Sequence, residues 1–220
     1  MPDESTRFLK EEAKRLTDDN RDLREELTAL RESVHALSAL YNMSQKITAD
    51  TDVLMLLGRI LDTSMAVLKA SDGSLMLLDD ETGELAFAVV RGEAAGRLEG
   101  YRVPKGQGIA GAVAISRKPE IILDPRRDPR FFASVDETLG FRTRSMVCVP
   151  ISLDDGRVLG VIEVLNKVSD REFTPDDLDL LLVVAQLAAT AMRRAERAAE
   201  QVERRRRAAL FQKPVPPVSS

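Results

Sequence analysis

The chain has 220 residues, of which 44% are hydrophobic and 31% are charged, a balance typical of globular proteins. A net charge of −4 gives no indication of a nucleic-acid-binding protein, and a single cysteine excludes an intrachain disulfide. No apolar run reaches the roughly 18 residues of a membrane span, and the N-terminus lacks a signal-peptide core. We therefore expect a soluble cytoplasmic protein without membrane contact.

Residues 1–38 carry a heptad repeat that predicts a coiled coil. Leucines recur every seven residues from Leu9 to Leu37, and taking them as position d places Asn20 at position a. Asparagine at a fixes register and partner number, so Asn20 is the predicted register residue of a parallel homodimer. The alternative is a long helix folded back on its own domain. Two charge pairs between g and e positions favour the parallel dimer: Asp19 with Arg24, and Glu26 with Arg31.

Residues 39–190 are predicted to form one α+β domain. A helix is expected over 52–69, with Thr51 or Asp52 as its N-cap and Ser71-Asp72-Gly73 as its stop signal. Strands are expected over 74–78, 85–90, 102–104, 120–123, 146–153 and 158–165, and short helices over 109–115 and 133–139. The strands are mostly joined by hairpin turns, as at Asp154-Asp155-Gly156, so the sheet should be antiparallel with helices on its faces.

A long helix is predicted to begin at Pro175 and to continue to about Leu210. Its apolar residues form a broad face that should pack on the sheet, after which residues 191–211 leave the domain. The cations of Arg204–Arg207 suit the negative end of the helix dipole, and a nucleic-acid or membrane patch is the alternative interpretation. Residues 212–220 are rich in proline and serine and are expected to be disordered.

Four stretches of the central domain together resemble a GAF domain, in particular the GAF modules of cyclic-nucleotide phosphodiesterases and bacterial adenylyl cyclases. They are GSLMLLDDETGEL, VPKGQGIAGAVAISRKPEIILDPRRDPRF, GFRTRSMVCVPI and GRVLGVIEVLNK. The resemblance covers about residues 40–190. It implies a six-stranded antiparallel sheet with dimerising helices on one face and a small-molecule pocket on the other.

The resemblance also implies a set of site residues. The candidate ligand contacts are Ser74, Val90, Arg91, Ile109, Ala110, Asp136 and Thr143. A family signature that braces the pocket is matched by Asn166, Lys167, Phe173 and Asp177, whereas the final glutamate of that signature is replaced by Leu178. Two further positions depart from the pattern: Arg91 stands where a cyclic-GMP-binding relative has an acidic residue, and Leu139 stands where a hydroxyl would help.

Several of these residues have structural interpretations that need no ligand. The run Thr174–Asp177 reads as a capping box that begins the last helix, and Lys167 would want a carboxylate such as Asp177 nearby. Glu163 lies within an apolar strand, where it could face a ligand cavity, although a partly exposed or lysine-paired glutamate is the favoured expectation. The amides of Gly108–Ala110 open a helix and could hold a phosphate, or the glycines could simply serve the turn.

The sequence offers no set of catalytic residues. Cys148 is expected to be a small core residue, and GAF relatives that attach a bilin or reduce methionine sulfoxide use cysteines that this chain lacks. His35 is the only histidine, so haem ligation, zinc sites and histidine-based triads are excluded. No cofactor is expected other than a possible cyclic-nucleotide ligand.

Taken together, these patterns predict a non-catalytic homodimeric sensor that binds a small molecule, such as cyclic AMP or cyclic GMP, and relays it through flanking helices to a downstream signalling protein. The alternative is a coiled-coil interaction scaffold whose GAF domain binds no ligand. Binding of nucleic acid is not expected.

Overall fold

The structure is a computed structural model that describes residues 4–45, 47–48, 51–133, 136, 140–168 and 172–211. The chain divides into two compact units, Met1–Ala39 and Leu40–Ser220. The first unit consists of most of the helix α1 (Glu4–Ser44), and the second contains a sheet with its own helices. Each unit is described by itself.

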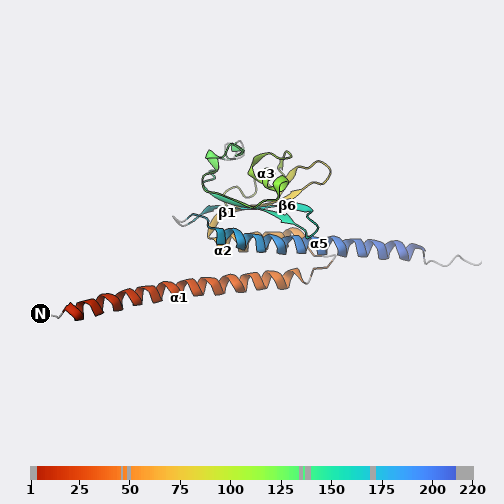
Figure 1. Cartoon of the computed structure of the whole chain (residues 1–220). Helices are drawn as coiled ribbons and strands as arrows, with labels where there is room; N and C mark the ends of the chain where they lie inside the picture. The colour runs from red at the N-terminus through yellow and green to blue at the C-terminus, as the bar shows by residue number, and fades with distance from the viewer. Residues whose placement is uncertain are drawn as a thin grey trace, which may run out of the picture. The chain divides into compact units, whose positions relative to one another are not determined.

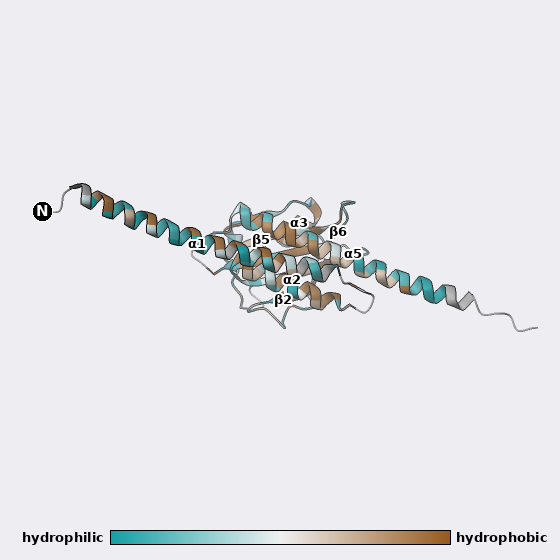
Figure 2. Cartoon of the chain, turned by 90° about the horizontal axis from the view of Figure 1, so that it is seen from below, coloured by the Kyte–Doolittle hydropathy of each residue, from teal (hydrophilic) through white to brown (hydrophobic). Residues whose placement is uncertain are grey.

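The predicted N-terminal helix is present and is longer than the predicted coil. Within the single chain its leucine stripe is exposed: Leu9, Leu16, Leu23 and Leu30 each expose more than half of their surface, between 56% and 66%. Figure 2 shows hydrophobic residues recurring along α1 among hydrophilic ones. An uncovered apolar stripe of this length is what a coiled-coil partner would bury, although pairing itself remains a prediction.

The second unit is organised by one antiparallel sheet of six strands, as predicted. The strands are β1 (Ala70–Leu78), β2 (Leu85–Arg91), β3 (Arg102–Val103), β4 (Glu120–Ile122), β5 (Met146–Ser152) and β6 (Val158–Lys167). They lie in the order β3-β2-β1-β6-β5-β4, so β1 and β6 occupy the centre. The pairing of β1 with β6 joins the two halves of the domain, because β1 to β3 come before α3 in the chain and β4 to β6 come after it.

Helices cover both faces of the sheet. Helices α2 (Val53–Leu68) and α5 (Pro175–Phe211) lie on one face, and the short helix α3 (Gly108–Ser116) lies on the other (Figure 1). Asp52 is the N-cap of α2, since its carboxylate accepts a hydrogen bond from the Met55 amide at 3.0 Å. A 3₁₀ turn, η1 (Pro125–Arg127), occupies the loop predicted after the fourth strand.

One predicted boundary was wrong, and it affects the site. Ser71-Asp72-Gly73 does not stop a helix but lies inside β1, which begins at Ala70. Helix α2 instead ends through Lys69, whose backbone adopts a left-handed conformation with φ of 52° and whose amide bonds back to the helix. Gly73 fits the strand because a Cβ there would lie 3.0 Å from the Glu163 carbonyl oxygen on β6.

The other boundaries differ by a few residues or fall partly outside the described chain. Strand β6 continues to Lys167 instead of ending at 165, and α5 ends at Phe211. Of the short helix predicted over 133–139, Ala133 and Asp136 are described, and both are helical. The tail predicted to be disordered, 212–220, lies outside the described residues.

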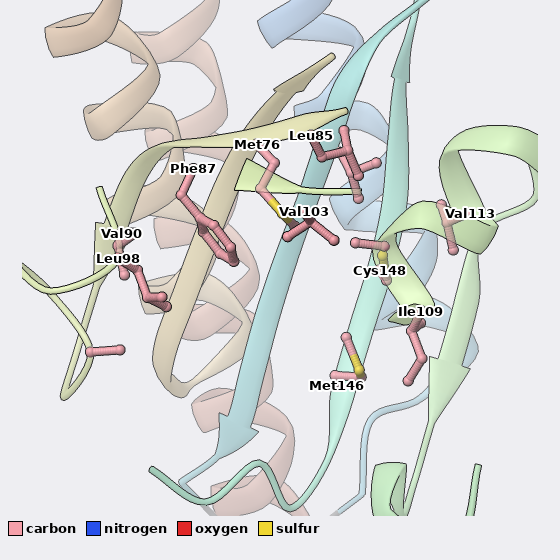
Figure 3. Close-up of a cluster of buried hydrophobic side chains, with 13 residues drawn as sticks. Met76, Leu85, Phe87, Val90, Leu98, Val103, Ile109, Val113, Met146 and Cys148 are labelled. Atoms are coloured by element: carbon pink, nitrogen blue, oxygen red, sulfur yellow. The ribbon is translucent and has the colours of Figure 1, made fainter. Parts of the chain in front are cut away.

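The sheet separates two layers of buried side chains. Every residue of β5 from Met146 to Ile151 is buried, which confirms that this strand is covered on both faces. Figure 3 shows the layer beneath α3, where Ile109 and Val113 of the helix join Met146 and Cys148 of β5. Against the opposite face, α2 and α5 bury large side chains that include Leu57, Ile60, Leu61 and Leu181.

Gly160 on β6 is predicted to tolerate no side chain. A Cβ at this position would lie 2.1 Å from the carbonyl oxygen of Met76, a backbone atom that cannot move away without breaking the central pairing. We expect Gly160→Ala to lower the free energy of unfolding by about 2 kcal/mol or more, measured by urea denaturation.

The control for this prediction is Gly100→Ala. A Cβ there would meet no atom within 4 Å, so only the positive φ of 81° opposes it, and we expect a cost of about 1 kcal/mol. Equal losses in the two variants would contradict the steric argument.

Candidate ligand pocket

A cavity of about 100 Å³ lies between the sheet, the first turn of α3 and two segments that cover it. One covering segment follows β2 and contributes Ala94 and Leu98; the other precedes β5 and contributes Phe141 and Thr143. Most of the wall is apolar. The polar side chains in it include Asp72 and Ser74 of β1, Glu163 of β6, Asp136, and Thr143 of the second covering segment.

Strands β1 and β6 bring Ser74 and Glu163 to the wall of this cavity, and Cys148 of β5 lies next to them in the core. In the sheet register Ser74 of β1 and Cys148 of β5 each lie directly opposite Glu163 of β6. Directly opposed residues present their side chains on the same face. The Ser74 hydroxyl donates a hydrogen bond to Glu163 Oε2 at 3.0 Å, and the Cys148 thiol also bonds to this carboxyl group.

Glu163 is buried beside these two residues, so the expectation of a partly exposed or lysine-paired glutamate was wrong. It exposes 8% of its surface, lines the cavity, and has neutral donors for partners. Burial disfavours the ionised form more than the bonds from Ser74 and Cys148 favour it, so the pKa of Glu163 rises from 4.5 to about 7. Near neutral pH the pocket therefore contains a carboxyl group that can either donate or accept a hydrogen bond.

Cys148 is a fully buried core residue, as the sequence predicted. Burial first, and then the neighbouring Glu163 carboxyl, raise the pKa of its thiol well above the usual range. A thiol kept protonated in this way is a poor nucleophile.

Asp136 and Thr143 were proposed as ligand contacts, and the structure brings them together at the cavity wall. The two Asp136 carboxylate oxygens accept hydrogen bonds from the Thr143 amide and hydroxyl, both at 2.8 Å. Arg126 approaches the same carboxylate at 3.8 Å from the surface. These contacts hold Thr143 of the covering segment to Asp136. A ligand would meet a carboxylate that already holds two hydrogen bonds.

The opening of α3 forms another part of the wall. Ile109 and Ala110 are buried and line the cavity next to Gly108, which has a φ of 73°. The N-cap residue Gln107 makes no side-chain capping bond to the helix. The leading amides of α3 are therefore not satisfied by that side chain, and amides of this kind suit an anionic ligand group.

Val90 and Arg91, neighbours on β2, have different surroundings. Val90 is buried and packs with the hydrophobic side chains drawn in Figure 3. Arg91 lies at the edge of the cavity, but its guanidinium donates to Asp62 of α2 at 2.7 Å and to the Val90 carbonyl at 3.1 Å. The positive charge of Arg91 is thus paired with the carboxylate of Asp62 on α2.

The four residues of the family signature lie where β6 leads into α5. Asn166 has a left-handed φ of 57°, and its side chain bonds the Arg142 carbonyl and the Arg144 amide of the covering segment. The Lys167 ammonium bonds Asp177 and lies 5.2 Å from the centre of the Phe173 ring. Asp177 also accepts from the Thr174 amide at 2.8 Å, so the capping box is formed.

Asp72 is a pocket residue that the sequence analysis missed. It is 6% exposed and lines the cavity, and its carboxylate accepts hydrogen bonds from the Glu93 amide and the Asn166 side chain at 2.8 and 3.0 Å. The period-two alternation of Asp72, Ser74 and Met76 was the signal available, because it places all three on one face of β1. Reading Ser71-Asp72-Gly73 as a helix stop concealed it.

Within the described part of the chain, no group of three or more metal-ligating side chains is gathered as a metal site. In the same residues, no helix is long and apolar enough to cross a membrane.

Comparison with known proteins shows the family and the fold of the chain. A family model described as "GAF domain" matches residues 52–192. Two similar proteins are the dual 3′,5′-cyclic-AMP and -GMP phosphodiesterase 11 of Drosophila melanogaster, 29% identical over 170 residues, and phosphodiesterase 11A of Takifugu rubripes, 41% identical over 81 residues. The alignments cover 71% and 36% of this chain but only 12% and 9% of those proteins.

Solved structures show the same fold at low sequence identity. The GAF domain of a phosphoenolpyruvate-protein phosphotransferase from Coxiella burnetii matches with a TM-score of 0.65 and 18% identity, over 74% of this chain and 94% of that one. The free methionine-R-sulfoxide reductase of Neisseria meningitidis matches with a TM-score of 0.61 and 19% identity, over 76% and 91% of the two chains.

The raised pKa of Glu163 predicts a pH dependence of stability. Between pH 4.5 and 7 the folded chain retains a proton on Glu163 that the unfolded chain releases. The free energy of unfolding should therefore fall as pH rises through this window, by about 3 kcal/mol from this group. Glu163→Gln removes the titration, so its denaturation free energy should fall less than that of the wild type across the window.

The exposed Glu99 provides the control, because Glu99→Gln should keep the wild-type pH dependence. Parallel curves for the wild type and Glu163→Gln would contradict the raised pKa.

Proposed function

This chain belongs to the GAF domain family, and from that premise we propose that it is a non-catalytic, homodimeric sensor module. In this proposal the pocket binds a small molecule, with cyclic AMP or cyclic GMP as the first candidates, and the flanking helices relay the occupied state to a downstream signalling protein. The observation that carries the proposal is the mostly apolar cavity whose wall contains the buried, hydrogen-bonded pair Ser74 and Glu163.

The chemistry of the cavity suits a cyclic nucleotide. The apolar wall can take the faces of a purine, and the carboxyl group of Glu163 can bond a hydroxyl or an N–H group. The leading amides of α3, from Gly108 to Ala110, can receive a phosphate without a cationic side chain. The phosphodiesterases similar to this chain act on both cyclic nucleotides, as their names state.

The size of the cavity adds a condition. Its volume of about 100 Å³ is below the roughly 300 Å³ at which pockets for drug-sized ligands begin. A nucleotide could enter only if the covering segments moved outward. Binding would then be linked to a change in those segments, which is what a sensor requires.

The route to the signalling helices runs through the family signature. Lys167 ends a pocket strand and bonds Asp177 in the first turn of α5. A change in the covering segment held by Asn166 would reach this ion pair through the neighbouring residue. Figure 2 shows that α5 becomes largely hydrophilic towards its C-terminal end, as expected of a helix that leaves its domain.

A second candidate function is an interaction scaffold, in which the coiled coil joins two chains and the GAF domain binds no ligand. The exposed leucine stripe of α1 favours this function as much as it favours the sensor. The two functions differ only in whether the cavity takes a ligand. Both place the protein in the cytoplasm, away from membranes and nucleic acid.

A thermal-shift experiment with cyclic AMP and cyclic GMP tests the sensor function. A ligand present at about 100 times its Kd should stabilise the fold by ~2.7 kcal/mol. Ala110→Leu should abolish the shift by filling the cavity, whereas Ala66→Leu, on the exposed side of α2, should keep it. Lys167→Ala should weaken the shift by releasing Asp177. Absence of any shift with either nucleotide at millimolar concentration would leave the scaffold as the better account.

The register of the coiled coil is tested with Asn20→Leu. A buried polar residue at position a costs stability and restricts the number of strands. The variant should therefore melt at a higher temperature and populate oligomers larger than the dimer in light scattering. Lys14→Leu, at an exposed b position of α1 that faces away from the predicted seam, is the control. An unchanged melting temperature and mass for Asn20→Leu would contradict the predicted register.

A further inference from the structure

A series of polar contacts, linked by short stretches of backbone, runs from α2 to α5 past the cavity residues Arg91 and Asp72. It begins with Asp62 on α2, which bonds Arg91 of β2, and it ends with Lys167 of β6, which bonds Asp177 on α5. Between these ends lies the buried Asp72 of β1. We call this series the polar belt; its members are Asp62, Arg91, Asp72, Asn166, Lys167 and Asp177.

Asp72 joins the two halves of the belt. One carboxylate oxygen accepts a hydrogen bond from the Glu93 amide at 2.8 Å, and the other accepts one from the Asn166 side chain at 3.0 Å. Glu93 is two residues from Arg91, and Asn166 is next to Lys167. The α5 half therefore reaches the buried carboxylate through adjacent residues at the end of β6, and the α2 half reaches it through Arg91 at the end of β2 and the loop residue Glu93.

The same contacts hold both covering segments of the cavity. The segment 92–98 begins beside Asp72, where Gly92 has a φ of 89° and a Cβ would lie 2.2 Å from Asp72 Oδ1. The segment 141–145 is held by Asn166 through the Arg142 carbonyl and the Arg144 amide. Asp72 is thus bonded to one cover directly and to the other through a single side chain.

At the α2 end of the belt, a glycine leaves space for the ion pair between Arg91 and Asp62. Gly58 is buried inside α2, where glycine costs helix stability, and a Cβ there would lie 2.6 Å from Arg91 Nη2. The missing side chain lets the guanidinium cross the helix and reach Asp62. The Arg91 guanidinium therefore points towards α2, where it bonds Asp62, and not into the cavity.

We propose that Asp72 and Arg91 are positioning residues that couple both covers of the pocket to α2 as well as to α5. This inference rests on the proposed sensor function for its purpose, since it gives the pocket a second output through α2. The proposal can be tested on the chain without ligand. It states that breaking the contact of the polar belt with α2, on one face of the sheet, increases the mobility of the covering segments on the other face. Coupling of this kind travels through bonded groups that have two arrangements.

The test is hydrogen exchange of the full chain without ligand, measured by mass spectrometry. Asp62→Asn removes the exposed ion pair at the α2 end. We expect exchange in 92–98 to rise about two- to fivefold, the range that corresponds to an ion pair of this kind. Gly58→Ala, which displaces the guanidinium and leaves both charges in place, should give the same result.

Asp154→Asn is the matched control. It breaks another exposed pair between the sheet side and a helix, Asp154 with Arg193 at 3.0 Å, away from the belt. Exchange in 92–98 should stay at the wild-type rate. If Asp62→Asn and Asp154→Asn had the same effect on 92–98, the proposal would be overturned.

Asp72→Asn tests the junction. We expect faster exchange in both covers, 92–98 and 141–145, and a smaller added effect of Asp62→Asn in the double variant than in the wild type, because one route is already broken. Additive effects, or a change confined to one cover, would refute the junction. Because no nucleotide is used, these outcomes are independent of whether cyclic AMP or cyclic GMP binds.

Discussion

The register between β1 and β6 determines what the pocket contains. These two strands are the centre of the sheet, and their pairing places Ser74 opposite Glu163. A shift of one residue would turn the side chains of one strand to the other face, moving Glu163 into the apolar layer under α2 and α5. Gly160 enforces the register, because its missing Cβ allows the backbone of β6 to approach Met76. The chemistry of the site thus depends on backbone packing some distance from it.

Most of the fold could be predicted from the sequence because its signals are local. Hairpin turns, the β-branched strands and the cap at Asp52 each depend on a few neighbouring residues. The prediction failed at Ser71-Asp72-Gly73, where turn-forming residues are held in a strand by partners distant in sequence, including Asn166. A left-handed lysine ended α2 in place of the expected glycine, and lysine carries no sequence signal for that conformation.

The site was predicted less completely, for a related reason. Family resemblance identified positions such as Ser74 and Thr143, which the cavity does contain. It did not identify what those side chains bond, and the bonds determine their chemistry. Arg91 turns to Asp62, and Asp136 is engaged by Thr143. Glu163 was expected to be partly exposed or paired with a lysine. An isolated carboxylate is costly to bury, but cross-strand donors and a raised pKa make the burial tolerable.

In a sensor of this kind, a change at the cavity must reach the helices α2 and α5 through contacts that can rearrange. The sheet lies between the cavity and these helices and is densely packed, so deforming it would be costly. Loops and strand ends can move at lower cost, and Arg91, Asn166 and Lys167 of the polar belt lie at strand ends. A ligand that holds the covers open would weaken the contacts of Asp72 with Glu93 and Asn166, and each helix would lose one constraint. The energy available for signalling is then limited to the difference in ligand affinity between the two cover arrangements.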